Sequence, residues 1–429
     1  MRIAIIGGGI SGLVAARLLS REHEVDVFEK DVRLGGHTHT HTVFEEGRRL
    51  AIDTGFIVFN ERTYPNFTRL LADLRVASRA SNMSFSVRDE ASGLEYNGTS
   101  LDTLFAQRRN LLRPSFLGML SDVVRFNRAA KALAAGPESE LPLGEFLARG
   151  NYGRAFVEHY LVPMGSAVWS AAPSRMREFP AWTFARFFDN HGFLDLGDRP
   201  VWRVVAGGSS AYIEPLCAPF ARRIRRGAPV VGLARFDDRV VVRTADGARR
   251  SYDQVVIAAH SDQALALLED PSDAEREILG ALEYQENEAV LHTDASLLPR
   301  RPKARAAWNY HVRPAGETDD GRVAVTYWMN SLQSLDAREA YLVTLNRTGR
   351  IDPARILARM TYHHPVYTTA GLRARKRRGE ISGVRRTHYC GAYWGFGFHE
   401  DGVVSALEVA RSFGQGLTEA RPLEPVAAR

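Results

Sequence analysis

The first thirty residues constrain the fold more than any other part of the chain. A short apolar run, 2–6, is followed by the glycine turn 7–12, which satisfies G-x-G-x-x-G. An Ala/Leu-rich stretch, 13–19, has helical character, and a second apolar run at 24–29 ends in an acid. A lone glycine motif is weak evidence, but strand, glycine turn, helix, strand and terminal acid in one such unit predict a dinucleotide-binding domain.

Each residue of this unit has a physical role in that interpretation. Gly7 permits the tight turn, Gly9 lets the backbone approach a pyrophosphate, and Gly12 lets the helix pack closely on the strand. The free N–H groups at the start of the helix attract phosphate. Glu29 is suited to accept hydrogen bonds from a ribose diol.

Motifs farther along the chain indicate which dinucleotide is bound. Arg33-Leu34-Gly35-Gly36 resembles the R-x-G-G signature of FAD enzymes in the glutathione-reductase and amine-oxidase superfamily, and Asp53-Thr54-Gly55-Phe56 resembles their next flavin-contacting turn. Segments 205–210, 255–259 and 391–406 resemble later parts of the FAD domain in the expected order. The chain is thereby identified as similar to the flavin-containing amine oxidoreductases, which include monoamine oxidases, protoporphyrinogen oxidase, phytoene desaturases and a fatty-acid double-bond isomerase.

The resemblance implies a fold, a domain division and a set of cofactor contacts. The fold class is α/β, with a Rossmann-like FAD-binding domain formed by 1–74, 201–265 and 386–429, and an interleaved α+β substrate-binding domain formed by 75–200 and 266–385. The tail after Leu417 is expected to fray. The predicted FAD contacts are Gly7, Gly9, Ser11, Gly12, Glu29, Lys30, Gly35, Gly36, His37, Thr38, Gly55, Phe56, Val231, Gly391, Asp401, Gly402 and Val403.

Several positions depart from the amine-oxidase pattern. His37 replaces the arginine that follows the two glycines, and Val403 replaces a tyrosine of the aromatic cage that holds amines. The lysine near the flavin has no counterpart, and the corresponding strand offers His292. No cysteine lies at 362–369, where amine oxidases attach flavin covalently, so non-covalent FAD is expected. These departures argue against amine oxidation.

Other strings resemble a bacterial subgroup of predicted FAD-binding proteins associated with fatty-acid modification. They are 35–40, 97–101, 105–111 and 393–402. The leading hypothesis is therefore an FAD-dependent oxidoreductase that desaturates or isomerises a fatty-acyl chain, with His399, Glu400 and His292 as candidate catalytic residues. Two alternatives remain open: a flavin amine oxidase that uses O₂, and a non-catalytic flavoprotein that serves a lipid-modifying enzyme as its partner.

Composition narrows the partners and the compartment. The net charge of +6 is attributed to compositional bias, because no zinc-finger or RNA-recognition motif accompanies it and nucleic acid is not an expected ligand. The alternating His37, His39 and His41 lack acid or cysteine partners, so no metal site is predicted. Two cysteines and no spanning or signal segment predict a cytoplasmic protein.

An apolar stretch near residue 115 suggests peripheral contact with an anionic membrane. Its apolar residues are expected to share one helical face beside three arginines, an arrangement suited to a membrane interface and also to a packed core. The predicted docking residues are Leu112, Phe116, Leu117 and Met119, flanked by Arg108, Arg109 and Arg113. The aromatic-rich segment 179–202 could likewise line an apolar substrate tunnel or form core.

Overall fold

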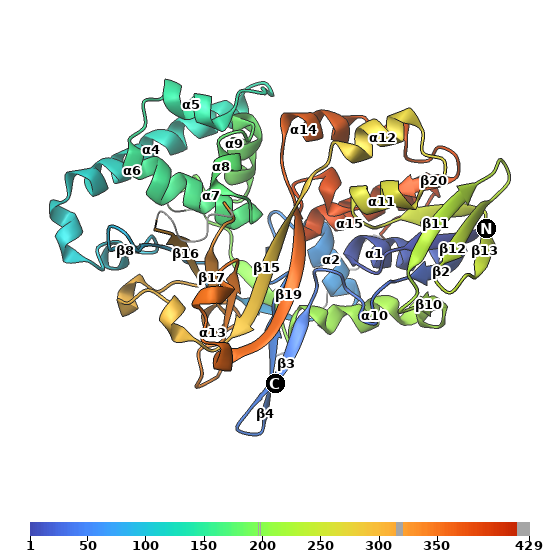
Figure 1. Cartoon of the computed structure of the whole chain (residues 1–429), viewed down its shortest axis with the longest axis horizontal. Coiled ribbons are helices and arrows are strands. Elements are labelled where there is room, and N and C mark those ends of the chain that lie inside the picture. Colours follow the sequence, from blue (N-terminus) through green and yellow to red (C-terminus); the bar gives the residue numbers. More distant parts are fainter. Residues whose placement is uncertain (196, 198, 315–320, 418–429) are drawn as a thin grey trace, which may run out of the picture.

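The predicted dinucleotide unit forms the centre of a five-stranded parallel sheet, at the right of Figure 1. The structure, a computed structural model, describes residues 1–195, 197, 199–314 and 321–417. The strand order is β10-β2-β1-β14-β20. The bounds are β1 (Arg2–Ile6), β2 (Glu24–Phe28), β10 (Ile224–Arg225), β14 (Gln254–Ile257) and β20 (Thr387–Tyr389). The sheet is buried on both faces, as the continuous apolar runs of its strands require.

Alternate residues of the central strand pack against different layers. Ile3 and Ile5 contact one core, formed with α1, α2, α10 and α15, whereas Ala4 and Ile6 contact a second core on the opposite face. The first layer comprises α1 (Ile10–Leu19), α2 (Pro65–Asp73), α10 (Ile213–Cys217) and α15 (His399–Ser412). The second comprises β11 (Val230–Arg235), β12 (Val240–Thr244), β13 (Arg249–Tyr252), α11 (Ser261–Leu267), α12 (Asp273–Gly280) and α14 (Thr369–Lys376).

The second layer changes the predicted domain division. Ile278 and Leu279 of α12 and Ala374 of α14 lie in the same core as Ala4 and Val255 of the parallel sheet. The sequence prediction had assigned both helices to the substrate domain, because a helix's amphipathic pattern does not indicate which sheet it covers. Residues 418–429 of the predicted FAD-binding segment lie outside the described residues.

A seven-stranded mixed sheet forms the second half of the molecule, with order β19-β15-β18-β17-β16-β7-β8. Neighbouring strands are antiparallel except β16 and β7, which are parallel. Its strands are β7 (Phe85–Asp89), β8 (Leu94–Asn97), β15 (Tyr284–His292), β16 (Trp308–Val312), β17 (Val325–Trp328), β18 (Leu342–Leu345) and β19 (Ile356–Pro365). Because β15 and β19 are long, they extend from this sheet toward the parallel-sheet half (Figure 1).

Helices 114–190 form a layer beside this sheet, at the upper left of Figure 1. They are α4 (Pro114–Ala135), α5 (Leu143–Arg149), α6 (Arg154–Phe156), α7 (Val162–Trp169), α8 (Pro173–Met176) and α9 (Ala181–Asn190). Two short helices, α3 (Leu101–Leu104) and α13 (Met329–Leu332), follow strands of the sheet. Among the described residues, none of the helices combines the length and apolarity needed to cross a bilayer.

Two small sheets lie between the halves. The hairpin of β3 (Thr40–Glu45) and β4 (Arg48–Asp53) projects at the bottom of Figure 1. The strands β5 (Val58–Asn60), β9 (Trp202–Val205) and β6 (Ser78–Ala80) form the other, in that order. Asp53, at the end of β4, accepts hydrogen bonds from the Ser209 backbone N–H and hydroxyl, which ties the turn after β4 to the turn after β9.

Candidate functional site

The glycine turn after β1 has the geometry of a ligand cradle. A Cβ atom built on Gly12 would lie 2.0 Å from the Gly7 carbonyl oxygen, and one built on Gly7 would lie 2.4 Å from the Ala258 carbonyl oxygen. A Cβ atom on Gly9 would meet nothing within 4 Å. Gly7 and Gly12 are therefore required for packing, whereas Gly9 faces open space at the N-terminus of α1.

Glu29 lies at the end of β2, beside this turn, and is buried. Its Oε2 accepts a hydrogen bond from the Gly8 backbone N–H at 2.6 Å, and its Oε1 accepts one from the Asp31 N–H at 2.9 Å. These bonds fix the carboxylate next to the cradle, and each oxygen retains acceptor capacity for a ribose hydroxyl. The neighbouring Lys30 is exposed, and Val231 is partly exposed on β11, at an irregularity in the β11–β12 pairing.

The Gly35-Gly36 turn closes over the first turn. Both glycines have positive φ, +113° and +57°, and a Cβ atom on Gly36 would lie 3.2 Å from the Gly9 Cα. The Arg33 guanidinium donates to the carbonyl oxygens of Thr38 at 2.7 Å and Gly36 at 2.8 Å. Arg33 therefore braces the turn that approaches the cradle.

The N-terminus of α15 lies beside that of α1. A Cβ atom on Gly402 would lie 2.9 Å from the Ser11 hydroxyl oxygen, so the two helices approach at their first turns. The pair offers two sets of helix N-terminal N–H groups in one region, which favours a ligand carrying phosphate and carbonyl oxygens. Val403 is fully buried in the core between the helices, so only its backbone can contact a ligand.

The loop that leads into α15 is fixed by polar contacts. The Gly391 N–H donates to the Ser405 hydroxyl at 3.0 Å, and the Phe398 N–H donates to Asp401 Oδ2 at 2.8 Å. Burial raises the pKa of the Asp401 carboxyl to about 7. Asp401, in the first turn of α15, therefore fixes the end of the preceding loop through its hydrogen bond with the Phe398 N–H.

A chain of contacts joins His399 to the two turns predicted to contact flavin, at Gly35-Gly36 and Gly55-Phe56. Its Nε2 lies 2.8 Å from the Tyr212 hydroxyl, which lies 2.5 Å from the Thr38 hydroxyl. Its ring stacks on Phe56, with ring centroids 3.7 Å apart. The Phe56 N–H donates to the His37 carbonyl at 2.7 Å, and a Cβ atom on Gly55 would lie 2.0 Å from that same oxygen. Burial lowers the pKa of His399 to about 3, so its imidazole is neutral at pH 7.

Glu400 caps a helix. Its Oε1 accepts hydrogen bonds from the backbone and side-chain nitrogens of Asn66, and its Oε2 accepts one from the Phe67 N–H. These N–H groups belong to the first turn of α2, which has no capping side chain of its own. These contacts give Glu400 a structural role as the cap of α2, and its role as a proton acceptor stays a prediction.

His292 lies apart from this group. It is the last residue of β15, is fully buried, and places its Nε2 2.7 Å from the Thr344 hydroxyl. Gln285, near the start of β15, pairs with His364, and seven residues of strand span about 23 Å. His292 therefore lies at the end of β15 that is far from His364, and the structure does not bring it together with His37 or His399.

Sequence reasoning missed the side chains that surround His37. The His37 ring lies 5.1 Å from that of Tyr362, 5.5 Å from that of His364 and 6.2 Å from that of His260, measured between centroids. The Tyr362 hydroxyl lies 3.0 Å from that of Thr54, in the turn after β4. The adjacent histidines at 363–364 were the one sequence feature that pointed to this group. Sequence alone does not show that they lie beside His37, because the two segments are far apart along the chain.

Burial sets the charge of this histidine group. It lowers the pKa of His37 and His260 to about 4 and that of His364 to about 3, so all three imidazoles are neutral at pH 7. His37 Nε2 is buried and has no hydrogen-bond partner among the described residues. In the described ranges, no three or more His, Cys, Asp or Glu side chains are arranged so that they could hold a metal ion. His37 thus holds a free polar atom beside the second glycine turn.

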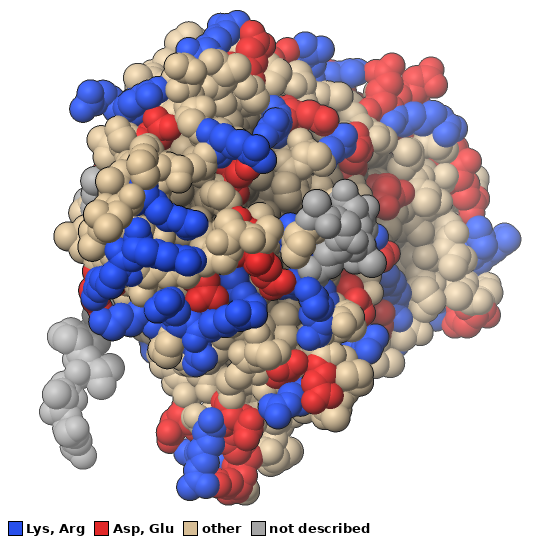
Figure 2. Space-filling view, turned by 60° about the vertical axis from the view of Figure 1, so that its left-hand side comes forward, with Lys and Arg blue, Asp and Glu red and all other residues tan. Residues whose placement is uncertain are grey.

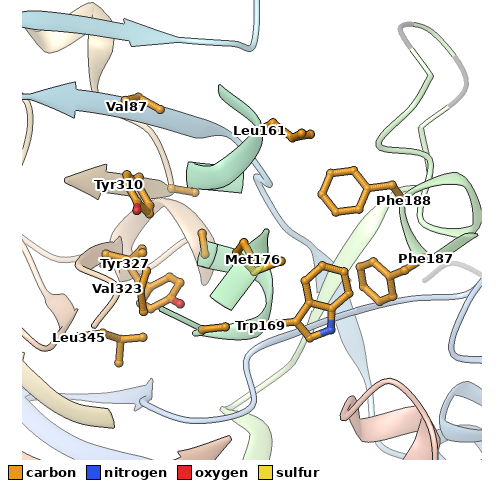
Figure 3. Packing of buried hydrophobic residues seen from close by; sticks show 14 of the residues in the cluster. Val87, Leu161, Trp169, Met176, Phe187, Phe188, Tyr310, Val323, Tyr327 and Leu345 are labelled. Carbon is orange, nitrogen blue, oxygen red and sulfur yellow. The ribbon is translucent and has the colours of Figure 1, made fainter. Parts of the chain in front are cut away.

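An apolar wall adjoins the same site. Phe184, Phe187 and Phe188 of α9 are buried in the large core of the second half, where Phe187 and Phe188 lie near Trp169 (Figure 3). The Phe187 ring stacks on Phe398, with centroids 4.8 Å apart, and lies 5.5 Å from that of Phe396. The aromatic segment is core in this structure, and it extends to the loop that enters α15.

These residues fit a flavin dinucleotide. The open position at Gly9 leaves room for a pyrophosphate, Glu29 is placed for a ribose, and the paired helix N-termini are placed for anionic and carbonyl oxygens. Between the Gly55-Phe56 turn and the start of α15, His37 Nε2 is a buried polar atom still in need of a partner. The space at Gly9 and the position of Glu29 are thus compatible with the pyrophosphate and a ribose of the predicted cofactor.

Solved structures share the overall fold. A CLA-producing fatty acid isomerase from P. acnes matches with a TM-score of 0.69 at 19% identity, covering 96% of this chain and 98% of that one. A cyclohexylamine oxidase from Brevibacterium oxydans IH-35A matches with a TM-score of 0.67 at 16% identity, covering 96% and 99%. These similarities confirm the predicted α/β fold class.

Curated relatives match over shorter stretches. The FAD-dependent oxidoreductase oblC of Cochliobolus heterostrophus is 25% identical over 194 residues, which are 43% of this chain and 38% of that protein. The flavin-dependent L-tryptophan oxidase RebO of Lentzea aerocolonigenes is 44% identical over 55 residues, 13% of this chain and 12% of that protein. The aligned regions thus span well under half of each relative.

The family itself is established by a longer match. A model described as flavin containing amine oxidoreductase matches residues 10–357, which include the helix α1, the Gly35-Gly36 turn, the turn after β4, and the strands β15 and β18. The matched range covers about four fifths of the chain and includes the second glycine turn of this site, at Gly35-Gly36. The chain belongs to the flavin-containing amine oxidoreductase family and is an FAD-dependent oxidoreductase.

Proposed function

We propose that this enzyme removes or relocates a hydride on a fatty-acyl chain. The observation that carries this proposal is the continuity of the aromatic core with the loop entering α15, through the Phe187–Phe398 stack. His191, which lies 3.9 Å from the Phe187 ring between centroids, has its pKa lowered to about 4 by burial and is uncharged at pH 7. An apolar wall with neutral polar groups suits a hydrocarbon substrate.

The roles of the residues follow from their positions. When bound, the flavin supplies the hydride acceptor. The aromatic side chains orient the acyl chain and exclude water from it. Loss of a hydride and a proton from neighbouring carbons leaves a double bond, and His37 Nε2 takes up that proton. In the isomerase variant, the chain already carries a double bond, and both the hydride and the proton return to it, the hydride at a different carbon, so that the double bond is displaced.

Product analysis tests this proposal. We expect the holoenzyme, incubated with acyl lipids, to produce chains that have lost two hydrogens or carry a displaced double bond, detected by mass spectrometry. His37→Gln should retain flavin and lose most turnover, because it removes the proton acceptor. His41→Gln, in the same histidine run, is the control and should remain active. Acyl chains left unchanged by the flavin-loaded enzyme would refute the proposal.

We also infer that the flavin is held without a covalent bond. Both cysteines, Cys217 and Cys390, are buried in the core beneath α1. Burial raises the pKa of their thiols to about 11 and 12 respectively, which disfavours the reactive thiolate. Acid precipitation should therefore release all of the flavin into the supernatant. A pellet that stays yellow would mean a covalent link through Cys390 or a histidine.

A further inference from the structure

We propose that residues 97–117 and 299–305 together form a docking surface for an anionic lipid bilayer. This basic–leucine surface lies at the end of the seven-stranded sheet, at the left of Figure 1, beyond β8. It includes the short helix α3 and the 3₁₀ turns 108–112 and 302–304. The proposal concerns binding and does not depend on which substrate the flavin oxidises.

Apolar side chains project from this surface into solvent. Leu112 is 87% exposed, Leu101 77%, Leu111 48% and Leu117 44%. Phe116 and Met119, also predicted to dock, are instead buried in the core, where the Phe116 ring packs against that of Tyr96. The helix α4 turns these two inward, and the preceding turn presents leucines outward. Side chains such as Leu112 can enter the boundary between headgroups and acyl chains.

Cations surround the leucines. Arg108, Arg109, Arg300, Arg301 and Lys303 are exposed, and Arg113 is half-buried. Within residues 97–117 and 299–305, the sequence has a single acid, Asp102, which pairs with Arg108 and Lys303. Figure 2 shows Lys and Arg side chains gathered on the side of the molecule where these segments lie.

Most of these cations are available for headgroups. In the described part of the chain, no carboxylate lies within ion-pair distance of Arg109, Arg113, Arg300 or Arg301. The Arg109 guanidinium donates to the Gly93 carbonyl oxygen, which leaves its other N–H groups free to bind phosphate. Each arginine near an anionic membrane strengthens binding by roughly fivefold at low salt.

The two segments are locked together although they are about two hundred residues apart in sequence. The buried carboxylate of Glu95 accepts hydrogen bonds from the backbone N–H groups of Arg300 at 2.9 Å and Arg301 at 3.0 Å. The Asn97 side chain donates to the Arg305 carbonyl oxygen at 2.9 Å. The surface is therefore preformed, and binding a bilayer does not require it to fold first.

The combination of exposed leucines and cations selects the partner. Nucleic acid or a soluble acidic protein would engage the arginines through phosphates or carboxylates. Neither requires Leu101, Leu111 and Leu112 to be exposed to water in the absence of a partner. A bilayer with anionic headgroups takes both kinds of side chain at once.

Vesicle flotation of the holoenzyme tests the proposal. Wild type should float with phosphatidylcholine vesicles that contain phosphatidylglycerol and should be largely released at high salt; with phosphatidylcholine alone it should bind poorly. The triple variant Arg109→Glu/Arg300→Glu/Arg301→Glu should bind the anionic vesicles at least tenfold more weakly. Leu111→Asp/Leu112→Asp should also bind more weakly, and both variants should keep their flavin because the changed side chains are exposed.

Matched variants on the flavin-binding half control for net charge and hydrophobicity. Arg222→Glu/Arg249→Glu/Arg276→Glu changes the charge by the same amount at exposed positions, and Phe236→Asp removes a 47% exposed apolar side chain. These controls should bind as wild type does. Failure of wild type to float, or equal losses in the controls and the surface variants, would overturn the proposal. Equal binding by wild type and the surface variants would also overturn the proposal. That result would favour a soluble acidic partner as the ligand of this surface.

Discussion

Replacing Gly9 with valine should abolish flavin retention while leaving the fold intact. Gly9 has φ −79° and ψ 179°, a conformation open to any residue, and a Cβ atom there meets no protein atom within 4 Å. The valine side chain would fill the space left for the pyrophosphate. We expect binding to weaken by a hundredfold or more, about 3 kcal/mol. The ratio of flavin to protein absorbance measures this loss, and circular dichroism measures the fold.

Gly12→Val is the contrasting variant. Its Cβ atom would lie 2.0 Å from the Gly7 carbonyl oxygen inside the packed turn, so this change should destabilise the protein itself, by roughly 3 kcal/mol. Loss of flavin with a native spectrum in Gly9→Val, but loss of the fold in Gly12→Val, is the expected pair of results. A Gly9→Val protein that purifies fully yellow would mean that the pyrophosphate lies elsewhere.

The apoprotein should lose stability steeply as pH falls below about 6.5. An imidazole with a depressed pKa is neutral in the folded chain and takes up a proton on unfolding, so its contribution is complete above pH 6.5 and is lost as pH falls toward 4. Burial depresses the pKa of eight histidines to about 3 or 4. They are His37, His39, His191, His260, His292, His364, His388 and His399.

Three carboxyls act in the opposite direction. Burial raises the pKa of Asp53 to about 6 and that of Asp401 to about 7, and it also raises the pKa of Glu400, so the folded chain holds their protons more tightly than the unfolded chain does as pH falls. Because these imidazoles outnumber the carboxyls, a net uptake of several protons on unfolding remains, and each proton changes the free energy of unfolding by about 1.4 kcal/mol per pH unit.

Urea unfolding at pH 7, 6 and 5 measures this slope. The midpoint should fall sharply between pH 6 and 5. His388→Gln, which removes a buried histidine next to the Phe413 ring, should fall less steeply than wild type, by the equivalent of about one proton. A midpoint that stays constant from pH 7 to pH 5 would mean that these imidazoles are not buried as described.

The cofactor-binding half could be predicted from sequence because its information is local. The turn at Gly7–Gly12 fixes β1, α1 and their junction within a few residues, and the acid that follows β2 returns to the same turn. In β1, Ile3 and Ile5 alternate with Ala4 and Ile6, so the two pairs point to opposite faces of the sheet and pack in two different cores. The family and fold class predicted from these motifs are confirmed by the family match and by the solved structures.

The substrate side could not be predicted in the same way because its geometry arises from distant segments. Glu400 caps α2 although more than three hundred residues separate them, and His37 meets Tyr362 and His364 only because β19 crosses toward the parallel sheet. Phe116 and Leu112 looked alike in sequence, yet one is buried and the other exposed. Residue type and spacing carry no information about such contacts between distant segments.

Anaerobic mixing tests the central claim, that an acyl chain is the hydride donor, most directly. The holoenzyme is mixed without oxygen with an acyl lipid or with a simple amine, and the flavin absorbance near 450 nm is followed. We predict bleaching by the acyl lipid, complete for desaturation and transient for isomerisation, and no bleaching by the amine. Bleaching by the amine but not by acyl lipids would contradict the account and identify the enzyme as an amine oxidase.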